Sequence, residues 1–221
     1  MFTETKATSF NQFLTKTYSI MFLNIVVSAI ASFITINFMP QLITSTAFAW
    51  GSLITIILFS LIFTHVTIKN PANGFILMLI FSYLIGVSSS SIFLVYTQAS
   101  ITGAFISASS LFAGLSLYGV TTKRNVNSIG GYVTALILGA FIIEVVNIFL
   151  HSSMLATILD WIFLIGFMIY TIIDTNNLKR LYAAQSSQHA INALAILGAF
   201  NLYLDFVNIF LSLVELFDKE N

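Results

Sequence analysis

The stretch YSIMFLNIVVSAIASFITINF, Tyr18–Phe38, is apolar along most of its length and contains no Asp, Glu, Lys or Arg. A helix needs roughly 20 such residues to cross the hydrocarbon of a bilayer. The run is longer than the apolar core of a signal peptide and no small-residue cleavage site follows it, so we expect a retained first helix. Six further runs, separated by polar, proline or charged residues, predict helices at about Thr46–Ile68, Gly74–Tyr96, Ile101–Val120, Ile129–Leu150, Met154–Ile173 and Ala193–Phe217.

The composition also indicates a chain that lies almost entirely in a membrane. Hydrophobic residues make up 58% of the 221 residues and charged residues 7%, whereas a soluble domain is typically about 25% charged. Strands of a membrane barrel are about ten residues long and alternate in polarity, and these runs do not. We therefore predict an all-α membrane protein whose seven transmembrane helices form one domain, 18–217, between tails at 1–17 and 218–221.

The distribution of lysine and arginine predicts the orientation, because cytoplasmic loops are enriched in these residues. Seven basic residues fall on one side of the predicted helices, namely Lys6, Lys16, Lys69, Lys123, Arg124, Lys179 and Arg180, and only Lys219 falls on the other. We expect a cytoplasmic N-terminus, as in a multi-pass protein of a bacterial inner membrane. Seven full crossings would place the C-terminus outside, whereas a broken or re-entrant seventh helix would return it to the cytoplasm.

Cysteine is absent from the chain, which excludes disulfides, thiol nucleophiles and cysteine-bound metal centres. The net charge is zero and there is no basic patch typical of nucleic-acid binding. We expect the lipid bilayer as the main partner, and no cofactor.

Asp205 is the most informative polar residue, because it lies near the middle of the last apolar run, in LYLDFVNIFL. Ionisable groups inside hydrocarbon are costly, so they usually face protein or a water-filled cavity. The spacing of 4, 3, 4 and 3 residues places Asn201, Asp205, Asn208, Ser212 and Glu215 on one helix face. This polar stripe is consistent with a hydrogen-bonding seam between helices or with an ion or proton pathway.

Asp174 ends the predicted sixth helix. It is a candidate site residue because Asp205 lies on the next helix. Consecutive antiparallel helices can bring the two carboxyl groups together. Two close carboxyl groups do not both ionise cheaply, so one of them holds a proton. We predict a pH-sensitive latch, closed when the pair shares a proton and repelled when both groups are charged.

Three further carboxylates lie toward the end of the bundle that has almost no basic residues. Glu144 is on the outer half of the fifth helix with Asn147 and His151, and Asp160 begins the sixth helix beside Trp161. Together with Glu215 they would concentrate cations at an outer mouth. We expect Asp160 to be a solvated rim residue, whereas Glu144 is equally consistent with a functional role and with a buried hydrogen-bonded acid.

Small residues gather on single faces of the third and fourth predicted helices, and we expect both faces to pack against other helices. The residues are Ser82, Gly86 and Ser89 or Ser90 on the third helix, and Ser107, Ser110, Gly114 and Thr121 on the fourth.

Three motifs resemble the Bax inhibitor family of transmembrane proteins. SLYGVTTKRNVNSIGGYV, Ser116–Val133, is similar to the family's loop between helices 4 and 5. IDTNNLKR, Ile173–Arg180, resembles the end of its sixth helix, and LYLDFVNIFLSLVELF, Leu202–Phe217, resembles its final helix. The chain departs from the pattern at Asn125, where many members carry an acid, and at Glu215, where a basic residue is frequent.

The resemblance implies six helices around a central seventh and a pH-dependent leak of calcium gated by an aspartate pair, here Asp174 and Asp205. Calcium would pass these aspartates transiently, since two carboxylates do not supply the 6–8 oxygen ligands that it prefers. The resemblance also implies an alternative, a non-conducting regulator that binds a membrane protease or quality-control complex. An aspartyl protease is disfavoured, because the chain reads Leu202-Tyr203-Leu204-Asp205 and lacks the Gly-x-Gly-Asp pattern.

Overall fold

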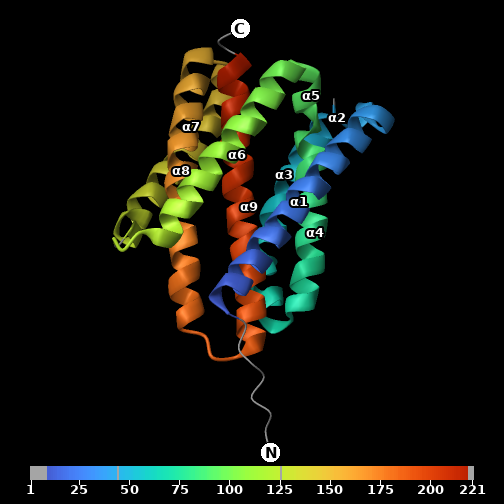
Figure 1. Ribbon diagram of the computed structural model, residues 1–221. Coiled ribbons are helices and arrows are strands. Elements are labelled where there is room, and N and C mark those ends of the chain that lie inside the picture. The colour runs from blue at the N-terminus through green and yellow to red at the C-terminus, as the bar shows by residue number, and fades with distance from the viewer. Residues whose placement is uncertain (1–8, 44, 125, 219–221) are drawn as a thin grey trace, which may run out of the picture. The chain divides into compact units, whose positions relative to one another are not determined.

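The computed structural model describes residues 9–43, 45–124 and 126–218, and within these ranges every regular element is a helix. Figure 1 shows them in chain order. The elements are α1 Phe10–Phe38, α2 Pro40–Ile43, α3 Thr46–Lys69, α4 Pro71–Ser88, η1 Ser89–Ser91, α5 Ile92–Val95, α6 Gln98–Thr121, η2 Val126–Ile129, α7 Gly130–Leu150, α8 Ser153–Ala183 and α9 Gln188–Asp218. Lys6, Asn125 and Lys219, which entered the sequence predictions, lie outside the described residues.

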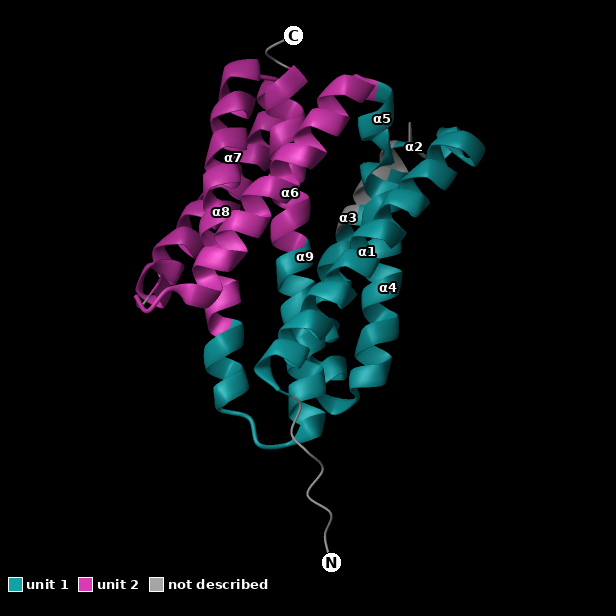
Figure 2. Ribbon diagram, in the orientation of Figure 1, with its two compact units in different colours: residues 1–94, 178–203 teal, residues 95–177, 204–221 magenta. Residues whose placement is uncertain are grey.

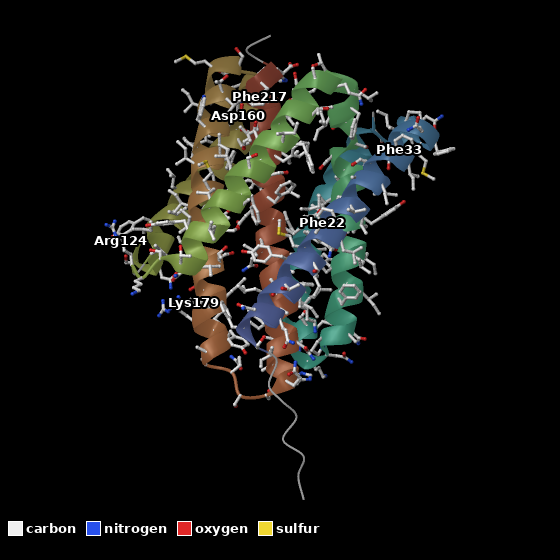
Figure 3. All side chains as sticks on the ribbon, viewed as in Figure 1. Phe22, Phe33, Arg124, Asp160, Lys179 and Phe217 are labelled. Carbon is white, nitrogen blue, oxygen red and sulfur yellow. The ribbon has the colours of Figure 1, made fainter. Side chains whose placement is uncertain are left out.

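Among the residues that the structure describes, six helical segments are long and apolar enough to cross a membrane, and the chain is therefore a multi-pass membrane protein. They are Phe10–Phe38, Pro71–Val95, Gln98–Thr121, Val126–Leu150, Ser153–Ala183 and Gln188–Asp218. Large apolar side chains are exposed along them, among them Phe22 at 65% and Phe33 at 63% on α1, both labelled in Figure 3. Such surfaces suit lipid. The predicted crossing at Thr46–Ile68 corresponds to α3, and a seventh crossing stays a prediction.

The chain divides into two compact units, coloured separately in Figure 2. Unit 1 comprises residues 1–94 and 178–203, and unit 2 comprises residues 95–177 and 204–221. The boundaries between the units fall within α8 and α9. The first half of α9 therefore belongs to unit 1 and the second half to unit 2.

In unit 1, α1 and α4 pack closely through small residues. A Cβ atom added to Gly86 of α4 would clash with the backbone of Ser28 in α1. One turn further along α1, the Ser32 hydroxyl donates to the Gly86 carbonyl at 2.6 Å. The packing expected of Ser82 and Gly86 is therefore confirmed, because glycine lets the two backbones approach closely enough for this hydrogen bond.

A buried hydrogen-bond network joins α1, α4 and α9 within unit 1. The Ser28 hydroxyl lies 2.6 Å from the Tyr203 hydroxyl and 2.7 Å from the Ser82 carbonyl. Since Ser28 has one hydroxyl hydrogen and a carbonyl can only accept, the Tyr203 hydroxyl donates to Ser28. The Ser82 hydroxyl donates in turn to Asn24 Oδ1 at 2.8 Å, and Asn24 Nδ2 donates to the Ile20 carbonyl. Tyr203 has no exposed surface, so this bond fixes α9 without access to water.

In unit 2, the face of α6 that packs is not the one expected from the sequence. Ser110, Gly114 and Thr121 are exposed, and a Cβ at Gly114 would meet nothing within 4 Å. The buried small residues are instead Ser100, Ala104, Ala108, Ser116 and Gly119. Gly119 lies against α8, where Asn176 Nδ2 donates to its carbonyl at 3.1 Å. The packing predicted for Ser110, Gly114 and Thr121 is wrong because the small-residue pattern left out alanine, whereas Ser107 is half-buried.

Three helix starts also differ from the sequence prediction. α1 begins at Phe10 rather than near Tyr18, because Ser9 and Gln12 form a capping box and Phe13 is buried. Pro40 and Pro71, which lie between the predicted spans, begin α2 and α4. Proline suits the first helical position, where its missing N–H would have no helical partner.

The hydrophilic stretch 174–189, which lies between the predicted spans Met154–Ile173 and Ala193–Phe217, is mostly helix. α8 continues to Ala183, and α9 is unbroken from Gln188. Thr175, Asn176 and Leu178 are buried, and Leu178 packs against Gly198 of α9. Packing of one face therefore maintains the helix through a polar sequence that would otherwise indicate a loop.

We expect Gly86→Ala to destabilise unit 1 by about 1–3 kcal/mol, as overpacking does. The matched control is Gly114→Ala, which has open space and should leave stability unchanged or slightly raised. Thermal unfolding in detergent compares the two variants, and equal melting temperatures would contradict the close approach of α1 and α4.

We expect Tyr203→Phe to cost about 1 kcal/mol, the net value of one hydrogen bond. Ser28→Ala should cost more because it also removes the link to Ser82. In a double-mutant cycle, the two substitutions should be non-additive. Additive losses in melting temperature would show that Tyr203 and Ser28 act separately.

Candidate functional site

The structure brings the side chains of Asp174 and Asp205 together inside unit 2. Asp174 is half-buried on α8, and Asp205 on α9 is only 4% exposed. The two carboxyl groups lie close enough for the charge of Asp174 to act on Asp205. Asp174 does not end its helix as expected, since α8 runs on to Ala183. The pair therefore lies between packed helices, where α9 faces α8.

The residue that follows Asp205 packs into an aromatic cluster. Phe206, the next residue, packs edge-to-face on Phe105 and Phe112 of α6, with ring centroids 5.8 Å apart in both pairs. The Oδ2 atom of Asp205 is buried and accepts no hydrogen bond from the described part of the protein. An unsatisfied buried polar atom costs about 1–3 kcal/mol. At Asp205 itself, the stripe is therefore not a satisfied hydrogen-bonding seam.

Three further buried oxygens in unit 2 have no hydrogen-bond partner among the described residues. One is Oδ1 of Asn127 on η2, and the other two are the hydroxyls of Ser116 on α6 and Thr175 on α8. Ser116 is one turn from Gly119, and Gly119 contacts Thr175, so both hydroxyls belong to the α6–α8 contact. Native structures seldom leave such groups unpaired without water, an ion or a functional reason. Sequence reasoning missed both residues; the buried Ser-x-x-Gly spacing at Ser116 and Gly119 was the available signal.

The other residues of the predicted stripe have different environments. Asn208 Nδ2 donates to the Leu204 carbonyl of its own helix at 2.8 Å. Ser212 is 6% exposed and Glu215 is half-buried, and both are in unit 2 with Asp205. Asn201 is exposed and belongs to the half of α9 in unit 1. The structure thus keeps three stripe residues with Asp205 in one unit and places Asn201 in the other.

Carboxylates gather at the end of unit 2 where α9 ends. Asp160 is 6% exposed, so its prediction as a solvated rim residue is wrong. The residue lies two turns inside α8, which begins at Ser153, close to the predicted start at Met154. Figure 3 labels Asp160 and Phe217 near this end. Burial, followed by the charges of Glu215, Asp160 and Asp218, raises the pKa of Tyr96 to about 12. Tyr96, which precedes α6, had no sequence signal that set it apart.

The residues grouped with Glu144 have structural roles. Asn147 closes the turn between α7 and α8, since its Oδ1 accepts from the Ser152 amide at 3.1 Å and its Nδ2 donates to the Ser152 carbonyl. His151 is exposed and left-handed, with a φ of 51°. Glu144 is half-buried on α7. Across the part of the chain that the structure describes, no three His, Asp or Glu side chains form a metal-binding group.

Comparison with known proteins agrees with this architecture. Residues 10–221 match the family described as inhibitor of apoptosis-promoting Bax1. The inner membrane protein YbhL of Escherichia coli is 34% identical over 81% of this chain and 78% of its own length. An uncharacterized protein of Rickettsia prowazekii is 32% identical over 92% of this chain and 88% of its own.

A third relative, an uncharacterized membrane protein of Streptococcus pyogenes, is 28% identical over 96% of this chain and 94% of its own length. The family match covers all six apolar spans and both aspartates. The chain therefore belongs to the Bax inhibitor family of membrane proteins.

Proposed function

We propose that the chain is a pH-sensitive leak channel for cations, with calcium as the expected ion, and that Asp174 and Asp205 form its gate. One observation carries the proposal: Asp205 is 4% exposed, has an unpartnered carboxyl oxygen and lies within electrostatic range of Asp174. A buried carboxyl group that only packed two helices together would be expected to have its oxygens hydrogen-bonded.

The gate works through the charge of the pair. With one shared proton, the pair carries a single negative charge and the two helices stay in contact. With both carboxyl groups ionised, the like charges repel in surroundings that screen them poorly. The Ser116 and Thr175 hydroxyls, also unpartnered and buried in unit 2, would contact ions or water that pass the pair.

The carboxylates around Tyr96 support the choice of a cation. Asp160, Glu215 and Asp218 act together on this tyrosine, and a surface rich in one sign of charge concentrates counter-ions. Glu215 has a second role in the proposal, because it also ends the stripe of Asp205, Asn208 and Ser212. We place the entrance of the pathway at this end of unit 2, with Glu144 as a further candidate for its lining.

The membrane arrangement belongs to the same proposal. We place the N-terminus in the cytoplasm and count α3 as the seventh crossing. We propose α9 as the central helix, because 56% of its most apolar window is buried, compared with 22–39% in the other five spans. The membrane would be a bacterial inner membrane, where the related YbhL resides.

We expect purified protein in liposomes to pass calcium at a rate that changes about tenfold between pH 6 and pH 8, as one titrating proton allows. Asp205→Asn should flatten this dependence, because it removes one of the two titratable groups, and Asp174→Asn should do the same.

The matched control is Glu215→Gln, which also removes one carboxylate from α9. It should lower the flux while the pH dependence stays. A pH profile of Asp205→Asn equal to that of the wild type would contradict the gate. Absence of flux from all proteins, together with co-purification of a membrane protease, would support the non-conducting regulator instead.

The carboxylate cluster predicts the titration of Tyr96. Its pKa is raised to about 12 from an ordinary value of about 10, so folding disfavours the ionised phenol. Its contribution to stability should be complete below pH 10 and lost as the pH rises toward 12. The ultraviolet difference between wild type and Tyr96→Phe reports this titration. Glu215→Gln should lower the pKa; a tyrosine that ionises normally in both proteins would contradict the cluster.

A further inference from the structure

Unit 1 has an unusual charge composition. Its described residues, 9–43, 45–94 and 178–203, include no Asp or Glu, and they include four basic residues. These are Lys16, Lys69, Lys179 and Arg180. All described carboxylates of the protein are in unit 2. Within the described residues of unit 1, the positive charge is therefore not balanced by carboxylates of the same unit.

Three of these basic residues, Lys16, Lys69 and Arg180, lie at one end of unit 1 together with His189. This end is where α1 begins, α3 gives way to α4, α8 ends and α9 begins, at the foot of the teal unit in Figure 2. Lys69 is the last residue of α3, and Arg180 is in the last turn of α8. We call Lys16, Lys69, Arg180 and His189 the basic end.

Contacts between helices make the basic end one surface. The Lys16 ammonium of α1 donates to Asn192 Oδ1 of α9 at 2.8 Å. His189 Nε2 of α9 lies 3.0 Å from the Ile68 carbonyl of α3, and since a carbonyl only accepts, Nε2 carries the hydrogen. Tyr182 of α8 packs on Phe13 of α1 with ring centroids 5.0 Å apart.

The contact with α9 holds Lys16 in place without neutralising its charge. The partner of Lys16 is a neutral amide, which also accepts from Gln188 Nε2 at 3.2 Å. An ammonium has three hydrogens, so the geometry leaves Lys16 able to donate further. Positive charges assembled in this way attract an anion.

Apolar side chains border the basic end. Ile68 beside Lys69 is 57% exposed, and Leu181 beside Arg180 is 47% exposed. Phe10 adds a second ring against Tyr182, at 5.3 Å. A free phosphate would gain nothing from this border, whereas a lipid would place its head group on the cations and its chains along the apolar residues.

We propose that the basic end of unit 1 binds the phosphate of an anionic phospholipid, with Lys16 and Lys69 as its main ligands. The lipid supplies a negative charge that the described residues of unit 1 do not contain. This site is separate from the aspartate pair and does not depend on ion conduction.

The test measures lipid retention by native mass spectrometry of full-length protein released from nanodiscs of equal parts phosphatidylglycerol and phosphatidylcholine. Wild type should retain phosphatidylglycerol about tenfold over phosphatidylcholine, and Lys16→Gln with Lys69→Gln should reduce the preference to about twofold or less. Lys16→Arg with Lys69→Arg keeps both charges and should keep the preference. The matched control, Lys123→Gln with Arg124→Gln, removes two charges from unit 2 and should also keep it.

An equal loss in the Lys123→Gln, Arg124→Gln control would overturn the proposal, because the preference would then follow total charge. Displacement of the bound lipid by millimolar glycerol 3-phosphate would also overturn it, since it would identify a site for free phosphate esters. Circular dichroism checks that each variant is folded. If the glutamine double variant does not fold, the single Lys69→Gln variant replaces it, and an unchanged preference there overturns the proposal.

Discussion

Hydrocarbon supplies no hydrogen bonds, so each polar side chain in the spanning helices must find a protein partner or remain unpaired at a cost of several kcal/mol. Unit 1 meets this constraint mainly with neutral groups, although the Tyr18 hydroxyl is buried without a partner among the described residues. Asn24, Ser28, Ser82 and Tyr203 bond to one another and to backbone carbonyls. Hydrogen bonds in such a network reinforce one another and favour one arrangement of the helices.

Unit 2 meets the same constraint incompletely. Ser116, Thr175 and Asp205 each keep a buried oxygen without a hydrogen-bond partner among the described residues. A carboxyl group can lower this cost by holding a proton, whereas a hydroxyl cannot change its charge in the physiological range. The described carboxylates are all in unit 2, so the proposed response to pH belongs to that unit and not to the neutral network in unit 1.

The sequence was sufficient for features that depend on long apolar runs. Six predicted spans agree with helices that cross by length and composition, and the aspartate pair was identified by motif. The sequence was insufficient where packing between helices, rather than the polarity of the residues, decides whether a segment is helical. The segment that follows Asp174 resembles a loop because Thr175, Asn176 and Asn177 are polar, yet Asn176 donates to the Gly119 carbonyl across a helix contact. Such contacts between residues distant in sequence cannot be read from one chain.

Within the polar stripe on α9, Asp205 is the deeply buried residue that carries a titratable group. Asn208 uses its amide hydrogen on the Leu204 carbonyl one turn earlier, and neither Asn208 nor Ser212 changes charge near neutral pH. Glu215 acts on Tyr96 at the end of unit 2, together with Asp160 and Asp218. Among the residues of the stripe, Asp205 alone combines a titratable group, deep burial and a second carboxyl group on the neighbouring helix. A gate on α9 therefore needs only one residue to change charge, and the remaining stripe can act as a fixed polar lining.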